Sequence, residues 1–111
     1  MPGRFYVYLL ANRPCGWLYV GATGDLSRRI AEHKAGGQSG YAAGRGIDRL
    51  VWYETYPSLN QAVLREKRIK RWRRAWKFML VEQSNPRWTD LYSGLPARGA
   101  KAASQAGRDP A

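Results

Sequence analysis

Two short segments near the N-terminus, rich in aromatic and β-branched residues, constrain the fold most. They are FYVYLLA at 5–11 and GWLYVG at 16–21, and the four residues NRPC separate them. Segments of this kind joined by so short a loop are typical of a β-hairpin. If the last residue of the first segment pairs with the first residue of the second, the numbers of paired residues sum to 27 and Tyr8 lies directly opposite Tyr19. The sequence therefore predicts two neighbouring phenols on one face of a sheet.

A helix is predicted after this hairpin. Asp25 is a candidate N-cap, and the helix is expected to reach about Ala35, where the Gly36-Gly37 pair ends it. The glycine-rich stretch 36–46 is expected to form a loop.

The second half of the chain predicts one strand and two helices. The segment RLVWYETY at 49–56 has strand propensity, and Ser58 is placed to cap a long helix that begins near Leu59. A second helical stretch covers about 75–83. It is expected to end at the Asn85-Pro86 step, because the residue before a proline disfavours helical geometry.

The charge balance points to a polyanionic partner. The chain has 111 residues, room for one domain, with 19 Lys and Arg against 8 Asp and Glu, for a net charge of +11. We expect residues 1–96 to form the folded domain and residues 97–111, which hold no aromatic and no large aliphatic residue, to form a disordered basic tail. The 16 basic and 7 acidic residues before that tail leave a charge of +9 in the domain.

The small number of cysteine and histidine residues excludes several classes of protein. Cys15 is the only cysteine and His33 the only histidine, so an internal disulfide framework, a zinc finger and an iron–sulfur site are excluded. A lone thiol fits a reducing compartment. Because 5–11 is too short for a secretory signal and no apolar run approaches the roughly 20 residues that span a bilayer, we expect a cytoplasmic protein without membrane association.

Glu66 is a carboxylate on a helix face that periodicity assigns to the core. At about 100° per residue it lies close to the direction of Leu59, while the flanking residues Arg65, Lys67 and Arg68 are expected to project away. Desolvating a carboxylate is costly, so Glu66 needs a cation or a dense set of hydrogen bonds. Two interpretations stay open: a structural ion pair with an arginine across the core, and a ligand to a divalent metal ion.

The first predicted helix repeats this irregularity, because Arg29 and His33 share the stripe of two aliphatic residues, Leu26 and Ile30. Taken singly, an inward histidine or tyrosine is ordinarily a packed core residue. Five polar residues of the hairpin and the two helices nevertheless face inward: Tyr8, Tyr19, Arg29, His33 and Glu66. Such convergence predicts one functional site.

A dense basic run covers residues 65–77, with one acid and two tryptophans interleaved. No acidic residue is expected to neutralise it at i,i+4 spacing, so the run predicts a phosphate-binding surface rather than a merely solvated face. The nucleic-acid-binding candidates are Arg65, Lys67, Arg68, Lys70, Arg71, Arg73, Arg74 and Lys77. No helix-turn-helix, zinc-finger or RNA-recognition signature accompanies them, so no base preference is predicted. The other tryptophans, Trp17, Trp52 and Trp88, are expected in the core or at its edge.

Five short motifs occur in order along the chain. They are Tyr6-Val7-Tyr8, Tyr19-Val20-Gly21, Leu26-Ser27-Arg28-Arg29 followed by His33, REKRIKRW at 65–72, and NPRWTDL at 85–91. Together they resemble the GIY-YIG nuclease superfamily, and within it the small single-domain bacterial branch with a URI-type domain. Tyr6 stands where the first motif of the superfamily has Gly, which is usual in this branch. The branch has Phe-Thr and Lys-Tyr pairs where this chain has Tyr41-Ala42 and Gly44-Arg45, so a substrate-contacting loop is expected to differ.

The resemblance implies an α+β fold, a small three-stranded antiparallel sheet flanked by helices, and an endonuclease that hydrolyses phosphodiesters with Mg²⁺ or Mn²⁺. By this resemblance Glu66 holds the metal and Arg29 contacts the phosphate. Tyr8 is the general base, a role that requires nearby cations to lower the pKa of its phenol. Tyr19 and His33 assist by hydrogen bonding to the water, the phosphate or Tyr8.

The expected partner is DNA, with RNA as the open alternative, selected by its structure rather than by base sequence and in a repair or processing role. A second hypothesis is a catalytically silent nucleic-acid-binding module. A ribosome-associated protein is a third, supported by charge alone. Only the nuclease requires a metal ion.

Overall fold

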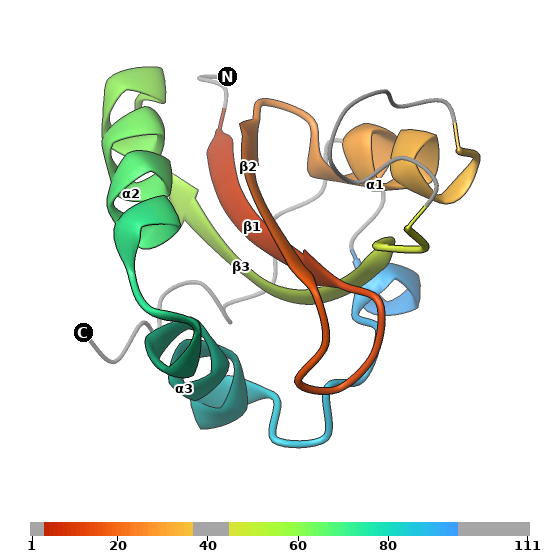
Figure 1. Cartoon of the computed structure of the whole chain (residues 1–111). Coiled ribbons are helices and arrows are strands. Elements are labelled where there is room, and N and C mark those ends of the chain that lie inside the picture. The colour runs from red at the N-terminus through yellow and green to blue at the C-terminus, as the bar shows by residue number, and fades with distance from the viewer. Residues whose placement is uncertain (1–3, 37–44, 96–111) are drawn as a thin grey trace.

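The computed structural model describes residues 4–36 and 45–95. Its elements are β1 (Phe5–Ala11), β2 (Leu18–Thr23), α1 (Leu26–Lys34), β3 (Arg49–Tyr56), α2 (Leu59–Arg71), α3 (Arg74–Ser84) and the short 3-10 helix η1 (Tyr92–Gly94) (Figure 1). The predicted α+β fold with one three-stranded antiparallel sheet is confirmed. The expected tail at 97–111, the domain boundary at 96 and most of the divergent loop at 41–45 lie outside the described residues.

The sheet has the strand order β2-β1-β3 and separates two layers of helices. Figure 1 shows α1 on one side of the sheet and α2 with α3 on the other. Since side chains alternate along a strand, Val7 and Leu9 of β1 pack in the core beneath α2 and α3, whereas Tyr8 and Leu10 pack in the core beneath α1. The central strand thus supplies both cores. None of the helices in the described part of the chain is long and apolar enough to cross a bilayer.

The loop of the β1–β2 hairpin is longer than predicted, and the pairing register of the two strands differs. The numbers of paired residues sum to 29, so Tyr8 lies opposite Gly21 and not opposite Tyr19. The prediction is wrong because the loop extends over 12–17: the Asn12 backbone N–H donates to the Trp17 carbonyl at 3.3 Å, and the Trp17 N–H donates to the Asn12 side chain at 2.8 Å. Since the shift is two residues, every side chain keeps its face, and both tyrosines still face α1.

Local signals fix the ends of the helices as predicted. The Asp25 carboxylate accepts the Arg28 backbone N–H at 3.2 Å at the start of α1, and the Ser58 hydroxyl accepts the Gln61 N–H at 3.2 Å at the start of α2. After α1, Gly36 has a φ of 75°, a left-handed conformation that favours glycine.

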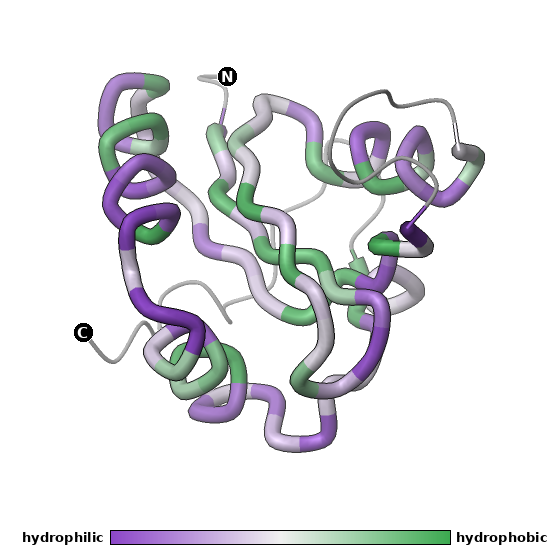
Figure 2. Tube along the Cα trace, in the orientation of Figure 1, coloured by the Kyte–Doolittle hydropathy of each residue, from purple (hydrophilic) through white to green (hydrophobic). Residues whose placement is uncertain are grey.

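Burial corrects two expectations about apolar residues. Trp52 and Trp88 are buried as predicted, but Trp17 is exposed, because it belongs to the hairpin loop. Leu59 is also exposed, and the buried face of α2 is centred closer to Ala62. Figure 2 shows hydrophilic residues dominating the connection from α2 into α3, where the basic run lies.

The residues after α3 cover β3, an outer strand of the sheet. Asn85 is buried and donates its side-chain amide to the Val51 carbonyl at 3.0 Å. The Asp90 carboxylate accepts the Leu50 backbone N–H at 3.2 Å, and the Leu91 N–H donates to the Leu50 carbonyl at 2.8 Å. The hydrogen bonds of this C-terminal motif therefore serve the fold.

Candidate active site

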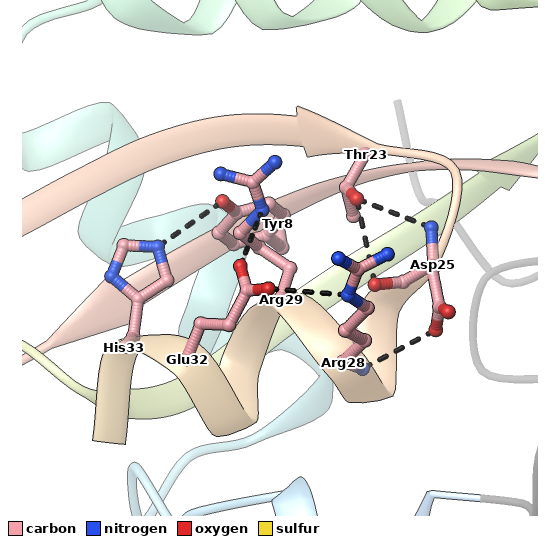
Figure 3. Close-up of polar contacts among 7 residues, drawn as sticks. All are labelled: Tyr8, Thr23, Asp25, Arg28, Arg29, Glu32 and His33. Carbon is pink, nitrogen blue, oxygen red and sulfur yellow. Dashed lines mark hydrogen bonds and ion pairs between the residues drawn. The ribbon is translucent and has the colours of Figure 1, made fainter. Parts of the chain in front are cut away.

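An aromatic cluster between the sheet and α1 brings together three of the predicted site residues. The ring centroids are 6.3 Å apart for Tyr8 and Tyr19, 6.1 Å for Tyr8 and His33, and 5.2 Å for Tyr19 and His33. The Tyr8 phenol oxygen lies 3.4 Å from His33 Nε2, a hydrogen bond whose donor depends on the imidazole tautomer (Figure 3). Tyr8 is 1% exposed and His33 is 7% exposed, so the structure holds this pair inside the fold.

Gly21 gives the Tyr8 phenol its place. The two residues are partners across β1 and β2. A Cβ atom at Gly21 would lie 2.5 Å from both Cζ and Oη of Tyr8, well inside the normal contact distance of about 3.5–4.0 Å between carbon atoms. Glycine is therefore required here for close packing against the ring.

The pKa of the Tyr8 phenol is raised, in the direction opposite to the one that a general base requires. Burial is the main cause, and Tyr19, Glu66 and Glu32 add to the rise, while the Arg29 charge opposes it. In the protein alone, the balance of burial and charge therefore does not supply the lowering of this pKa that the role of general base requires. Tyr8 is a neutral phenol at pH 7.

Burial and the charge of Arg29 lower the pKa of His33, while the carboxylates of Glu32 and Asp48 oppose that shift. The imidazole is therefore mostly neutral at pH 7. A neutral imidazole has one nitrogen that can accept a hydrogen bond. With the proton on Nδ1, His33 Nε2 accepts the Tyr8 hydroxyl.

Helix α1 also places two guanidinium groups and a carboxylate beside this pair. Arg29 is 40% exposed, with its Nε 3.7 Å from Glu32 Oε1. The Nε of Arg28 lies 3.2 Å from the other oxygen, Oε2, of the same carboxylate. Figure 3 shows Glu32 between the two arginines and next to the Tyr8 and His33 side chains. Arg29 can therefore reach both the aromatic cluster and an incoming anion.

Glu66, on α2, is 18% exposed, and its Oε2 lies 2.8 Å from Nζ of Lys70 one turn further on. The pairing partner is thus a half-exposed lysine of the same helix rather than an arginine across the core. This Glu66–Lys70 ion pair also corrects the expectation that the basic run has no acidic partner at i,i+4 spacing. The charge of Glu66 is one of the lesser causes of the raised pKa of Tyr8, although α2 lies on the opposite side of the sheet from α1 (Figure 1).

The donor set suits only one kind of metal site. Within residues 4–36 and 45–95, no group of three or more His, Cys, Asp or Glu side chains could hold a metal ion. Mg²⁺ commonly binds through one or two carboxylates and keeps water and substrate phosphate oxygens as its other ligands. A single carboxylate at Glu66 therefore fits Mg²⁺ or Mn²⁺ that binds together with substrate, and it does not fit a preformed cage of protein ligands.

Arg65 turns inward, contrary to its predicted place on the surface. Its Nε lies 3.0 Å from Oε1 of Glu54, and the two side chains are 14% and 4% exposed. The Tyr56 hydroxyl donates to the same oxygen, and the Arg65 guanidinium lies 5.4 Å from the ring centroid of Trp72. A buried carboxylate on β3 needs a counter-charge, which explains why Arg65 leaves the basic surface.

The other basic residues of the run fall into two groups. Lys70 pairs with Glu66, Arg74 donates to two backbone carbonyls of the hairpin loop at 3.3 and 3.1 Å, and Lys77 is half-buried, so that burial and Arg74 lower its pKa. The exposed remainder, which we name the outer basic face, consists of Lys67, Arg68, Arg71 and Arg73.

Two acidic residues that pair with arginines, Glu32 and Glu54, are not among the residues predicted to be functional. The signal for Glu32 is its helical spacing of three and four residues from Arg29 and Arg28. The signal for Glu54 is the two-residue period of β3, which puts it on the same face as Trp52.

The sequence matches one known protein family over most of its length. A model of the GIY-YIG catalytic domain matches residues 4–79 of the chain, a range that contains the aromatic cluster, Arg29 and Glu66. The chain belongs to the GIY-YIG family. GIY-YIG is a nuclease family, and the resemblance stated from the motifs is confirmed.

Several relatives of the chain carry the name UPF0213 protein. One from Aeromonas salmonicida is 34% identical over 88 residues, 79% of this chain and 63% of that protein, so the chain spans less than two thirds of it. The UPF0213 protein BH0048 of Halalkalibacterium halodurans is 40% identical over 76 residues, 68% of this chain and 80% of that protein. The UPF0213 protein NP_0776A of Natronomonas pharaonis is 41% identical over 83 residues, 73% of this chain and 94% of that protein.

One solved structure is also similar to this GIY-YIG chain. It is the solution NMR structure of the UPF0213 protein BH0048 from Bacillus halodurans. The two sequences are 34% identical, the match covers 78% of this chain and 92% of the other chain, and the TM-score is 0.49.

Proposed function

We propose that this protein is a Mg²⁺- or Mn²⁺-dependent endonuclease that hydrolyses phosphodiester bonds of DNA, selects its substrate by structure rather than by base sequence, and acts in DNA repair or processing. The observation that carries the proposal is the buried Tyr8–His33 pair beside the half-exposed Arg29. Membership of the GIY-YIG family supports it.

Arg29 would bind the scissile phosphate. Its planar guanidinium donates to two oxygens of a phosphate at once, and it neutralises the charge that builds on those oxygens during in-line attack. The 40% exposure of its side chain leaves it accessible to a strand of nucleic acid.

Tyr8 and His33 would accept the proton that the attacking water loses. A phenol with a raised pKa is scarcely ionised at pH 7, so Tyr8 acts as a relay: it accepts a proton from the water while its own hydroxyl proton passes to His33 Nε2. His33 can accept this proton because burial lowers its pKa and keeps it neutral. Tyr19 packs against both rings and helps to hold them in place.

Glu66 would hold the metal ion, for which it must share its carboxylate with Lys70 or release that lysine. A bound Mg²⁺ or Mn²⁺ supplies positive charge that polarises the scissile phosphate and stabilises the leaving oxyanion. Because the protein offers one carboxylate, we expect weak metal binding until phosphate oxygens complete the set of ligands.

The outer basic face would hold the DNA backbone. Its four basic residues are exposed at the end of α2 and the start of α3, and next to them Trp76 exposes about half of its surface. Contacts of this kind bind phosphates without regard to base sequence and weaken as salt rises.

Cleavage of labelled duplex, branched, nicked and single-stranded DNA, and of matching RNA, tests the proposal with Mg²⁺, with Mn²⁺ and with chelator. We expect metal-dependent cleavage, and we expect Glu66→Gln to slow it by about 100-fold or more, since a metal contributes several kcal/mol to the transition state and about 1.4 kcal/mol is a tenfold change in rate. Arg29→Ala should cost a comparable factor.

Glu82→Gln is the matched control, because it removes one exposed carboxylate on α3 and leaves an oxygen that can accept the Trp88 indole N–H. Equal rates for wild type and Glu66→Gln would remove the metal-ligand role. DNA binding without cleavage of any substrate would identify a catalytically silent binding module instead.

A further inference from the structure

The carboxylate of Glu32 contacts two arginines of α1, Arg28 and Arg29. Its Oε2 lies 3.2 Å from Nε of Arg28 and its Oε1 lies 3.7 Å from Nε of Arg29. The three residues lie on one turn of α1, at i,i+4 and i,i+3 spacing, so the helix itself sets this geometry (Figure 3). Each oxygen of the carboxylate therefore faces one guanidinium.

The same carboxylate acts on the proton-carrying pair. Glu32 raises the pKa of Tyr8 and that of His33, and Arg29 lowers both. The negative charge of Glu32 thus partly offsets the effect of the Arg29 charge on the pKa of Tyr8 and on that of His33, the two residues of the proposed relay. A phosphodiester bound by Arg29 would bring a second negative charge to this place.

A carboxylate and a phosphodiester present the same feature to an arginine, namely two oxygens that share one negative charge. We propose that Glu32 is a counter-anion built into α1, which holds Arg28 and Arg29 in the substrate-free protein and yields them to a phosphate of the nucleic acid. It thereby sets how tightly the site binds its substrate. This inference rests on the proposed function, because it names a phosphate of the substrate as the group that displaces Glu32.

The exchange weakens binding by a modest amount. Both partners of each pair are partly exposed, and ion pairs of this kind contribute little, so displacing Glu32 from two arginines costs a small factor in affinity. Removing the charge should therefore make the protein bind nucleic acid about two- to fivefold more tightly. Glu32 acts through Arg28 and Arg29 and is a positioning residue.

The test compares Glu32→Gln with wild type, with Glu82→Gln as the control that removes an equal charge on α3. Binding of fluorescently labelled DNA is followed by anisotropy with chelator present, so that no cleavage occurs. We expect about two- to fivefold tighter binding by Glu32→Gln, and binding by Glu82→Gln close to that of wild type.

Histidine NMR supplies a readout that a merely structural role would not move. His33 is the only histidine of the chain, so its ring signal in the untagged protein reports its titration alone. Since Glu32 raises the pKa of His33, Glu32→Gln should lower it, and Glu82→Gln should leave it unchanged. A chemical-shift map confined to α1 and the aromatic cluster would show that the fold is retained.

Unchanged or weaker DNA binding by Glu32→Gln would overturn the inference, and so would equal tightening by Glu82→Gln, which would reflect net charge alone. These results leave the nuclease proposal standing. Tighter binding by Glu32→Gln without cleavage of any substrate by wild type would refute the nuclease and support the counter-anion.

Discussion

Replacing Gly21 by alanine should destabilise the fold and separate Tyr8 from His33. The new Cβ would lie 2.5 Å from Cζ and Oη of Tyr8 and 3.0 Å from its Cε1. The ring would have to move by about 1 Å to restore an ordinary contact, yet it is 1% exposed and enclosed by the α1-side core. Overpacking of this kind costs about 1–3 kcal/mol, and each kcal/mol lowers the melting temperature of a domain this size by about 4–8 °C.

Gly24→Ala is the matched control for this substitution. Its Cβ would meet the Phe5 ring at 3.6 and 3.7 Å, an ordinary van der Waals contact, so we expect a change within about 0.5 kcal/mol. The assay is urea denaturation followed by tryptophan fluorescence, repeated in a Tyr8→Leu background, where the Gly21 substitution should cost less because the phenol is gone. Equal stability of the two alanine variants, or an equal cost of Gly21→Ala in both backgrounds, would refute the steric argument.

Two further predictions concern pH and the basic surface. Because the pKa of His33 in the fold lies below its ordinary value of 6.5, the unfolded chain binds more protons between those two values, so the free energy of unfolding should fall as pH drops below 6.5. Urea denaturation across that range should show a smaller fall for His33→Gln, and parallel curves for both proteins would contradict this. Cleavage should decline only as pH falls through the lower pKa of His33 in the folded protein, where the imidazole takes up a proton. Charge reversal at Arg68 and Arg71 should weaken DNA binding and flatten its salt dependence. By contrast, Arg65→Ala should lower the free energy of unfolding by about 3–5 kcal/mol, because it removes the Arg65 charge that pairs with the buried Glu54 carboxylate. An Arg65→Ala protein as stable as Arg68→Ala, or a double reversal with an unchanged salt slope, would contradict these assignments.

The elements of the fold could be predicted because their signals are local. The Asp25 and Ser58 caps and the β-branched and aromatic run at 49–56 give helix starts and a strand that match the structure. The hairpin register could not be predicted, since it depends on a contact between Asn12 and Trp17 that forms only when the loop closes. Hydrophobic alternation was unaffected, because a shift of two residues preserves the face of every side chain.

The site shows the same division between local pattern and tertiary context. Helical and strand periodicity bring Tyr8, Tyr19 and His33 together, as predicted. By contrast, Arg29 and Glu66 are linked to this cluster through the effect of their charges on the pKa of Tyr8. The raised pKa of Tyr8 could not be predicted from residue types, because it depends on how completely the fold removes the phenol from water. The inward turn of Arg65 was equally hidden, since its cause is a carboxylate on another element.

The C-terminal motif protects the rim of a very small sheet. Asp90 and Leu91 occupy both backbone groups of Leu50, so this residue of β3 cannot pair with a strand of another molecule. Shortening the chain ahead of Asp90 would uncover that rim, and the truncated protein should then self-associate through β-pairing although every residue of the proposed nuclease site is still present.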